Sequence, residues 1–153
     1  MSLQQATVTL FREAFEGREE GKDYTWFVEG REAILPTLEG IDAMTASHSP
    51  GSGLPSIAAH AYHIRYSLQW LNVPAGGTPP EGNWESTWEK QTVTDEEWSA
   101  LLADIKDRYR RGLKWLGENE DWSVEGGYTM FLGPLPHMAY HLGAIRVLLK
   151  VIH

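Results

Sequence analysis

The stretch LGPLPHMAYHLGAIRVLLK, residues 132 to 150, places His137 and His141 four positions apart within an apolar helical pattern. At about 100° per residue, both histidines fall on the apolar side of the predicted helix. Two imidazoles at this spacing can bind one ion, although the glutamate of the HExxH zinc motif is absent because Met138 follows the first histidine. The alternative is a pair of buried histidines that bond to the backbone or to water.

Apolar residues three and four positions apart recur through most of the chain, and this spacing predicts an all-α protein. We expect a short extra helix over residues 3 to 16 and long helices over residues 25 to 46, 56 to 71, 94 to 116 and 135 to 151. Four long amphipathic helices with extended connections are typical of a four-helix bundle, in which neighbouring helices need not all be antiparallel.

Local sequence indicates where two of these helices begin. Ser56 is a favourable N-cap, and Thr94 forms a capping box with Glu97. Pro36 lies inside the predicted helix over residues 25 to 46 and is expected to bend it, because proline has no N–H to donate.

Residues 72 to 93, NVPAGGTPPEGNWESTWEKQTV, are rich in glycine and proline and are much longer than an ordinary connection between helices. A loop of this length in a compact domain is more often a lid or a binding loop than a passive linker. Because it contains Trp84 and Trp88, we expect it to pack onto the body of the protein.

The composition limits the class of protein. With 153 residues and 42% hydrophobic content, the chain suits one domain with one core, over residues 1 to 153. A formal net charge of -8 argues against a nucleic-acid partner, which would require a clustered excess of Lys and Arg. The absence of cysteine excludes disulfides and thiolate ligands. No apolar run suits a signal peptide or a membrane span, so a cytoplasmic protein with no membrane partner is expected.

A third ligand would complete a metal site, and the helix over residues 56 to 71 offers His60 and His63 near the edge of its apolar stripe. Helical phase places His60 nearer the centre of the stripe and therefore does not select His63. Three neutral nitrogens would leave a fourth position for water, as in catalytic zinc sites. His48 and His153 are expected at the surface.

Two segments resemble the DinB-like (YfiT-like) superfamily of helical metalloenzymes. SIAAHAYHIRYSLQWL is similar to that family's second helix, where a metal-binding histidine follows the capping Ser or Thr by seven positions, and counting from Ser56 gives His63. HMAYHLGAIRVLLK is similar to the family's last helix, HxxxHxGxI, with His137 and His141 as the remaining ligands and Gly143 in its usual place.

The resemblance implies a bundle that holds a divalent ion, zinc or nickel, on His63, His137 and His141, and that often forms a homodimer. It implies a small-molecule substrate and the activity of a thiol-dependent S-transferase, a thiol-using isomerase or a metal-dependent hydrolase. A low-molecular-weight thiol from a second molecule suits a chain without cysteine, because a bound ion can lower the pKa of a thiol or of water. His60 stands where the family has an apolar residue, so it is an outer partner of a ligand, an alternative ligand or a core histidine.

The sequence singles out no catalytic residue. Tyr62 and Tyr140 beside the ligands, and Glu81 and Glu85 in the loop, are candidate helpers. Two rival interpretations stay open. One is a non-catalytic, stress-related bundle that binds a metal or a ligand, and the other is an interaction module that uses the Trp-rich loop and the acidic surface.

Overall fold

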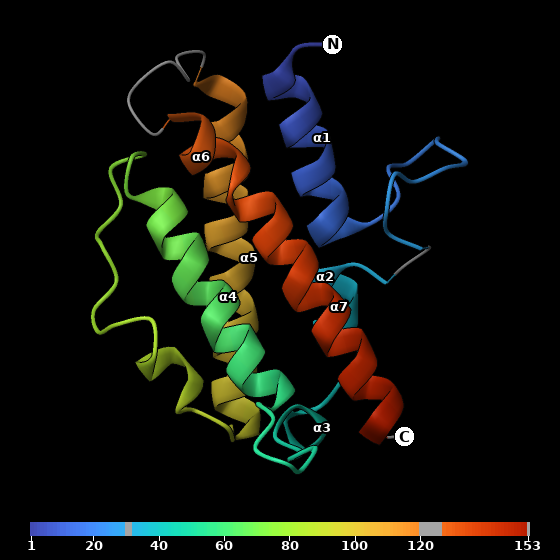
Figure 1. Cartoon of the computed structure of the whole chain (residues 1–153), viewed down its shortest axis with the longest axis vertical. Coiled ribbons are helices and arrows are strands. Elements are labelled where there is room, and N and C mark those ends of the chain that lie inside the picture. The colour runs from blue at the N-terminus through green and yellow to red at the C-terminus, as the bar shows by residue number, and fades with distance from the viewer. Residues whose placement is uncertain (30–31, 120–126, 153) are drawn as a thin grey trace.

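Long helices lie side by side in the computed structural model, which describes residues 1–29, 32–119 and 127–152 (Figure 1). The long helices are α1 (Leu3–Glu16), α4 (Ile57–Asn72), α5 (Asp95–Glu118) and α7 (Pro134–Ile152). The short ones are α2 (Ile34–Glu39), α3 (Ala43–Ala46), α6 (Gly127–Leu132) and the 3-10 helix η1 (Ser86–Trp88). The all-α prediction is confirmed for the described residues.

Each long helix packs against two others: α4 and α1 both contact α5 and α7. In Figure 1, α4 and α5 run in the same direction, and α1 and α7 run in the opposite direction. Two successive parallel helices need a connection that returns along their whole length. The long segment between α4 and α5 makes this return, which explains its length and brings it across one face of α4.

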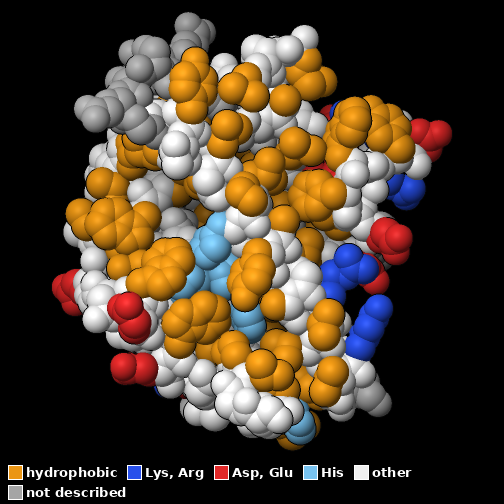
Figure 2. Space-filling model, in the orientation of Figure 1, with side chains coloured by type: hydrophobic (Ala, Val, Ile, Leu, Met, Phe, Trp, Pro, Cys, Tyr) orange, Lys and Arg blue, Asp and Glu red, His pale blue; other side chains and the backbone are white. Residues whose placement is uncertain are grey.

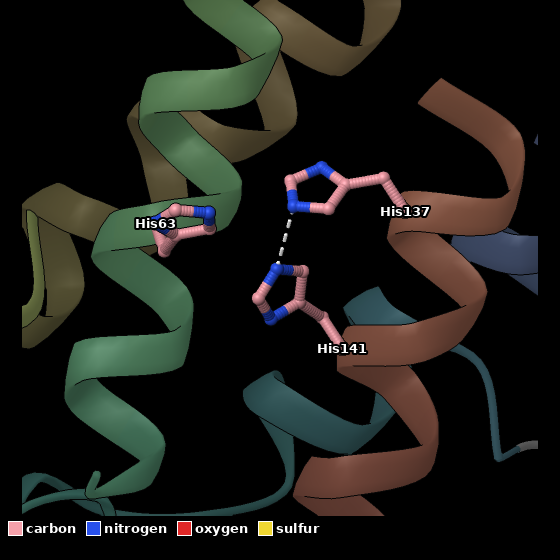
Figure 3. Close-up of side chains that lie close together, drawn as sticks. All are labelled: His63, His137 and His141. Atoms are coloured by element: carbon pink, nitrogen blue, oxygen red, sulfur yellow. Dashed lines mark hydrogen bonds between the residues drawn. The ribbon is translucent and has the colours of Figure 1, made fainter. Parts of the chain in front are cut away.

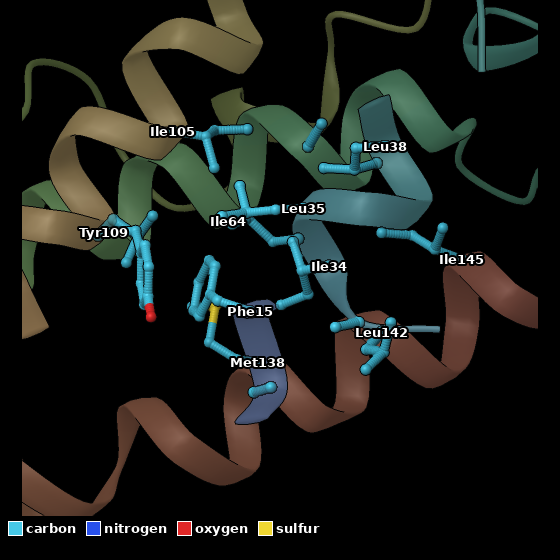
Figure 4. Close-up of a cluster of buried hydrophobic side chains, with 14 of the residues drawn as sticks. Phe15, Ile34, Leu35, Leu38, Ile64, Ile105, Tyr109, Met138, Leu142 and Ile145 are labelled. Atoms are coloured by element: carbon cyan, nitrogen blue, oxygen red, sulfur yellow. The ribbon is translucent and has the colours of Figure 1, made fainter. Parts of the chain in front are cut away.

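One cluster of buried apolar side chains joins the helices. It combines Phe15 of α1, Ile34 of α2, Ile64 of α4, Ile105 of α5 and Ile145 of α7 (Figure 4). Each of these side chains has no exposed surface, and burying one side chain of this kind contributes about 1.5–3 kcal/mol. The core therefore fixes α4 and α7, the two histidine-bearing helices, against the same set of neighbours.

The predicted long helix over residues 25 to 46 is wrong, because only α2 and α3 form within it. The amides of Trp26, Phe27 and Val28 donate to the carboxylate of Glu13 over 2.9, 2.7 and 3.0 Å. Three consecutive amides that converge on one buried carboxylate hold this segment as a loop against α1. Pro36 does not bend a helix but lies in the first turn of α2, where an N–H would have no acceptor in the helix.

The predicted bounds of α1 are confirmed. The prediction that α1 is an extra helix outside the main group of long helices is wrong. α1 packs against α2, α5 and α7, so it takes the place among the long helices that residues 25 to 46 were expected to fill. The glycine-rich connection before α7 also contains a short helix, α6, which sequence reasoning missed. No helix of the described residues is long and apolar enough to cross a membrane.

The predicted helix starts are confirmed. The Ser56 hydroxyl caps α4 by accepting from the Ala59 amide, and Thr94 with Glu97 forms the capping box of α5. Ser56 also binds the long loop, because its N–H donates to the Gln91 side chain and its hydroxyl donates to the Gln91 carbonyl, both over 2.7 Å. The first turn of α4 therefore anchors the end of the loop.

We predict that Glu13→Ala lowers the free energy of unfolding by about 3 kcal/mol, since it leaves three amides without their charged acceptor. Urea unfolding followed by circular dichroism measures this change. Glu20→Ala, at an exposed position nearby, is the control and is expected to have little effect. Equal stability of the two variants would contradict the role assigned to Glu13.

Candidate metal centre

His63 of α4 and His137 and His141 of α7 point into one space between the two helices (Figure 3). One ring nitrogen of each lies within 4.8 Å of the others. Nε2 of His137 and Nε2 of His141 are 2.8 Å apart. The structure thus brings together all three predicted ligands, from segments more than seventy positions apart.

The helices that carry these residues are antiparallel neighbours, and this geometry produces the cluster. Positions i and i+4 of α7 put His137 and His141 on one face, and α4 places His63 opposite them. His63 and His141 are 1% and 0% exposed, and His137 is half-buried on the outer side. An ion in this space would therefore be reached from the side of His137.

Burial makes the cluster electrically neutral. Loss of hydration, with smaller contributions from the neighbouring His137 and His60, lowers the pKa of His63 from its ordinary 6.5 to about 4. The pKa values of His137 and His141 are lowered for the same first reason. Neutral imidazoles keep the lone pairs that metal ions bind, so protons compete weakly for this site.

Thr87 of η1 sets the tautomer of His63. The Thr87 hydroxyl donates to the Trp84 carbonyl over 2.7 Å, so its oxygen is free to accept from Nδ1 of His63, 2.6 Å away. His63 then carries its proton on Nδ1, and Nε2 is the nitrogen left for an ion. Outer hydrogen bonds of this kind orient metal-binding histidines in many proteins.

His60 lies behind His141 and outside the group of three. Its Nδ1 is 2.9 Å from Nδ1 of His141, whereas His137 contacts the opposite nitrogen, Nε2, of the same ring. His60 is therefore a hydrogen-bond partner of a candidate ligand, which was one of the three roles left open by the sequence.

The separation of His137 and His141 is suited to sharing a proton. Nitrogens around a tetrahedral zinc ion stand roughly 3.3 Å apart, given bonds of about 2.0–2.1 Å. At 2.8 Å, the two Nε2 atoms are hydrogen-bonded. An ion would take the place of that shared proton. It would increase the distance between the two nitrogens by about half an ångström.

Two tryptophans of the long loop lie over the cluster, so the loop packs onto the body of the protein as predicted. The Trp88 ring stacks on His63 at 4.2 Å between centroids, and the Trp84 ring stacks on His137 at 5.3 Å. Figure 2 shows histidine side chains in a hollow that hydrophobic side chains surround on this face. The loop excludes water from part of the site and leaves an opening beside it.

Among the candidate helpers, Tyr140 contacts the cluster, with its ring 5.2 Å from that of His141. In the described part of the chain, no contact links Tyr62, Glu81 or Glu85 to the three histidines. Sequence reasoning missed Thr87, because a loop threonine has no periodic pattern that distinguishes it.

The two histidines expected at the surface have different outcomes. His48 is exposed and lies outside the cluster, as predicted. His153 lies outside the described residues.

Comparison with protein-family models, with curated proteins and with solved structures finds no match for this chain. Over the residues that the structure describes, the fold and the site define a helical protein with a cluster of three histidines, two buried and one half-buried, that could hold a metal ion.

We predict that acid destabilises the metal-free protein between pH 6.5 and about 4. The pKa values of His63 and His60 are lowered by folding from 6.5 to about 4, so over this range the unfolded chain binds protons that the folded protein does not. The free energy of unfolding therefore falls as pH falls through this window. Urea unfolding at several pH values measures it. His60→Phe should flatten the dependence and His48→Phe should not; identical profiles for both would contradict the prediction.

We predict that Thr87→Val weakens zinc binding by about 10- to 100-fold, because His63 loses the acceptor that holds its proton on Nδ1. Competition with a chromogenic chelator measures the affinity. Thr78→Val, at an exposed position of the same loop, is the matched control. Unchanged zinc affinity in the Thr87 variant would show that the hydrogen bond does not orient the ligand.

Proposed function

We propose that this chain is a metal-dependent enzyme of the DinB-like type, with a divalent ion held by His63, His137 and His141. The observation that supports this best is the convergence of three neutral imidazoles from two helices, two of them buried and one half-buried, with one ring nitrogen of each within 4.8 Å of the others. A group of three such nitrogens suits zinc or nickel, which favour imidazole ligands. The order of the histidines along the chain, and the packing of long helices side by side, support the resemblance in the two helix motifs.

The proposed chemistry follows from an open ligand position. A divalent ion with three protein nitrogens and a free position lowers the pKa of a bound water or thiol and so supplies a nucleophile near neutral pH. The chain's residues provide the setting: Thr87 orients His63, and Trp84 and Trp88 exclude water from one side. Since the chain has no cysteine, any thiol would come from a second small molecule.

The proposed reaction is therefore S-transfer from a small thiol, or hydrolysis, on a small-molecule substrate. A groove of about 530 Å³, a size typical of small-molecule sites, is lined by His60, which contacts His141 of the cluster. The half-buried position of His137 leaves the cluster open to such a molecule, whereas a macromolecule would be kept away by the tryptophan-bearing loop.

The first test is stoichiometric metal binding. We predict that purified protein binds about one zinc or nickel ion per chain by elemental analysis, and that His141→Ala loses it because the central imidazole of the cluster is removed. His48→Ala, at an exposed histidine outside the cluster, should retain the ion. Equal metal content in both variants would contradict the site.

Activity distinguishes the enzyme from its rival. The metal-loaded protein is assayed with N-acetylcysteine and chlorodinitrobenzene for thiol transfer, and with nitrophenyl acetate for hydrolysis. A metal-dependent rate that His141→Ala abolishes supports the enzyme. Full metal content without either activity would support a non-catalytic, metal- or ligand-binding protein instead.

A further inference from the structure

An apolar groove lies beside His60, the hydrogen-bond partner of His141, between the start of α4 and the outer face of α7. Its volume is about 530 Å³. Its walls are apolar and aromatic side chains, and they carry no Asp, Glu, Lys or Arg: Leu54, Pro55, Trp88, Tyr140, Val147 and Leu148. Such a surface favours an uncharged, apolar occupant, because burying a charge there without a partner would cost several kcal/mol.

Among the described residues, His60 is the imidazole that borders this groove. Within that part of the chain, its side chain makes one hydrogen bond, between its Nδ1 and Nδ1 of His141, over 2.9 Å. The ring nitrogen Nε2 is thus left to a molecule in the groove. His60, Trp88 and Tyr140 all contact the His141 ring, so a molecule bound there would lie beside the metal centre.

The protons on three histidines are coupled through two hydrogen bonds. Each neutral imidazole carries one proton, and each nitrogen pair needs one proton between its members. If His141 donates from Nε2 to His137, then His60 must donate from Nδ1, and its Nε2 is an acceptor. If His141 donates from Nδ1 to His60, then the Nε2 of His60 carries a proton and is a donor.

An ion selects the second arrangement. Metal binding through Nε2 of His141 requires that nitrogen to carry no proton, so the proton of His141 lies on Nδ1 and is donated to His60. His60 then presents an N–H on Nε2. The charge of every imidazole stays the same, and only the positions of the protons change.

We propose that the groove binds a small apolar molecule with an uncharged hydrogen-bond acceptor, such as a carbonyl oxygen, and that His60 recognises this acceptor through Nε2–H when an ion is bound. This inference rests on the proposed function and deepens it by naming the class of small molecule that the ion-loaded site would recognise beside His141. His60 is a specificity-determining residue in this scheme.

The experiment uses the full chain and the fluorescent naphthyl ketone prodan, whose emission depends on hydrogen bonding to its carbonyl. With zinc bound, prodan should bind about 3- to 10-fold more tightly than its propyl analogue, which lacks the carbonyl oxygen. This preference should disappear in His60→Phe and should persist in His48→Phe. Zinc should also raise the affinity of the protein for prodan. Thermodynamic linkage then requires prodan to raise the affinity for zinc by the same factor, which chelator competition measures.

Groove occupancy has its own matched pair of variants. Val147→Glu places a charge on the groove wall and should abolish prodan binding, whereas Val151→Glu, one turn further along the exposed face of α7 and outside the lining, should preserve it. Both positions are more than half exposed, at 61% and 63%, so neither change should disturb the core. Prodan binding that weakens as protein concentration rises would assign the groove to a second copy of the chain and overturn the proposal.

The outcomes separate the two proposals. Zinc binding with a carbonyl preference that survives His60→Phe would overturn the inference about His60 and leave the proposed function in place. Absence of both zinc and nickel by elemental analysis would overturn both.

Discussion

The condition on which the site depends is that several imidazoles stay uncharged in a space with little water. Each of the histidines at the centre has a lowered pKa, and loss of hydration is the first cause in every case. Burial of neutral imidazoles costs less than burial of charged ones, but it still requires their nitrogens to be paired. The hydrogen bonds among His60, His141 and His137 provide that pairing with the protons that neutral rings carry. The same neutrality preserves the lone pairs that an ion would need.

The direction of the helices places the cover on this cluster. Because α4 and α5 are parallel, the chain must return along α4 before α5 begins, and this return carries Trp84, Thr87 and Trp88 over the histidines. The return is fastened at its end by Gln91, which bonds to the cap of α4. A topology with only short connections would leave the cluster open to water and would raise the pKa of each imidazole towards its ordinary value. The loop is thus a part of the site and not an addition to it.

Sequence predicts the features that local physical chemistry determines, and it fails where distant residues compete. Ser56 and Thr94 start helices through bonds within four residues, so both starts follow from sequence. Trp26, Phe27 and Val28 lie in a segment with a helical pattern but donate to a carboxylate 13 to 15 positions away, and no local pattern reveals that competitor. The choice between His60 and His63 has the same character. Both are buried. Only the packing of α7 shows that His63 faces His137 and His141, while His60 lies behind His141.

The position of His60 makes the metal centre and the groove parts of one arrangement. A purely structural histidine behind His141 would need only to accept or donate one hydrogen bond, and an amide side chain would serve as well. An imidazole differs because its two nitrogens exchange roles when one proton moves, so a change at His141 is passed to the opposite side of the His60 ring. The groove lies on that opposite side and has no charged group that would mask such a change. In the proposed scheme, an imidazole at position 60 would therefore connect the proton positions at His141 with the groove that His60 borders.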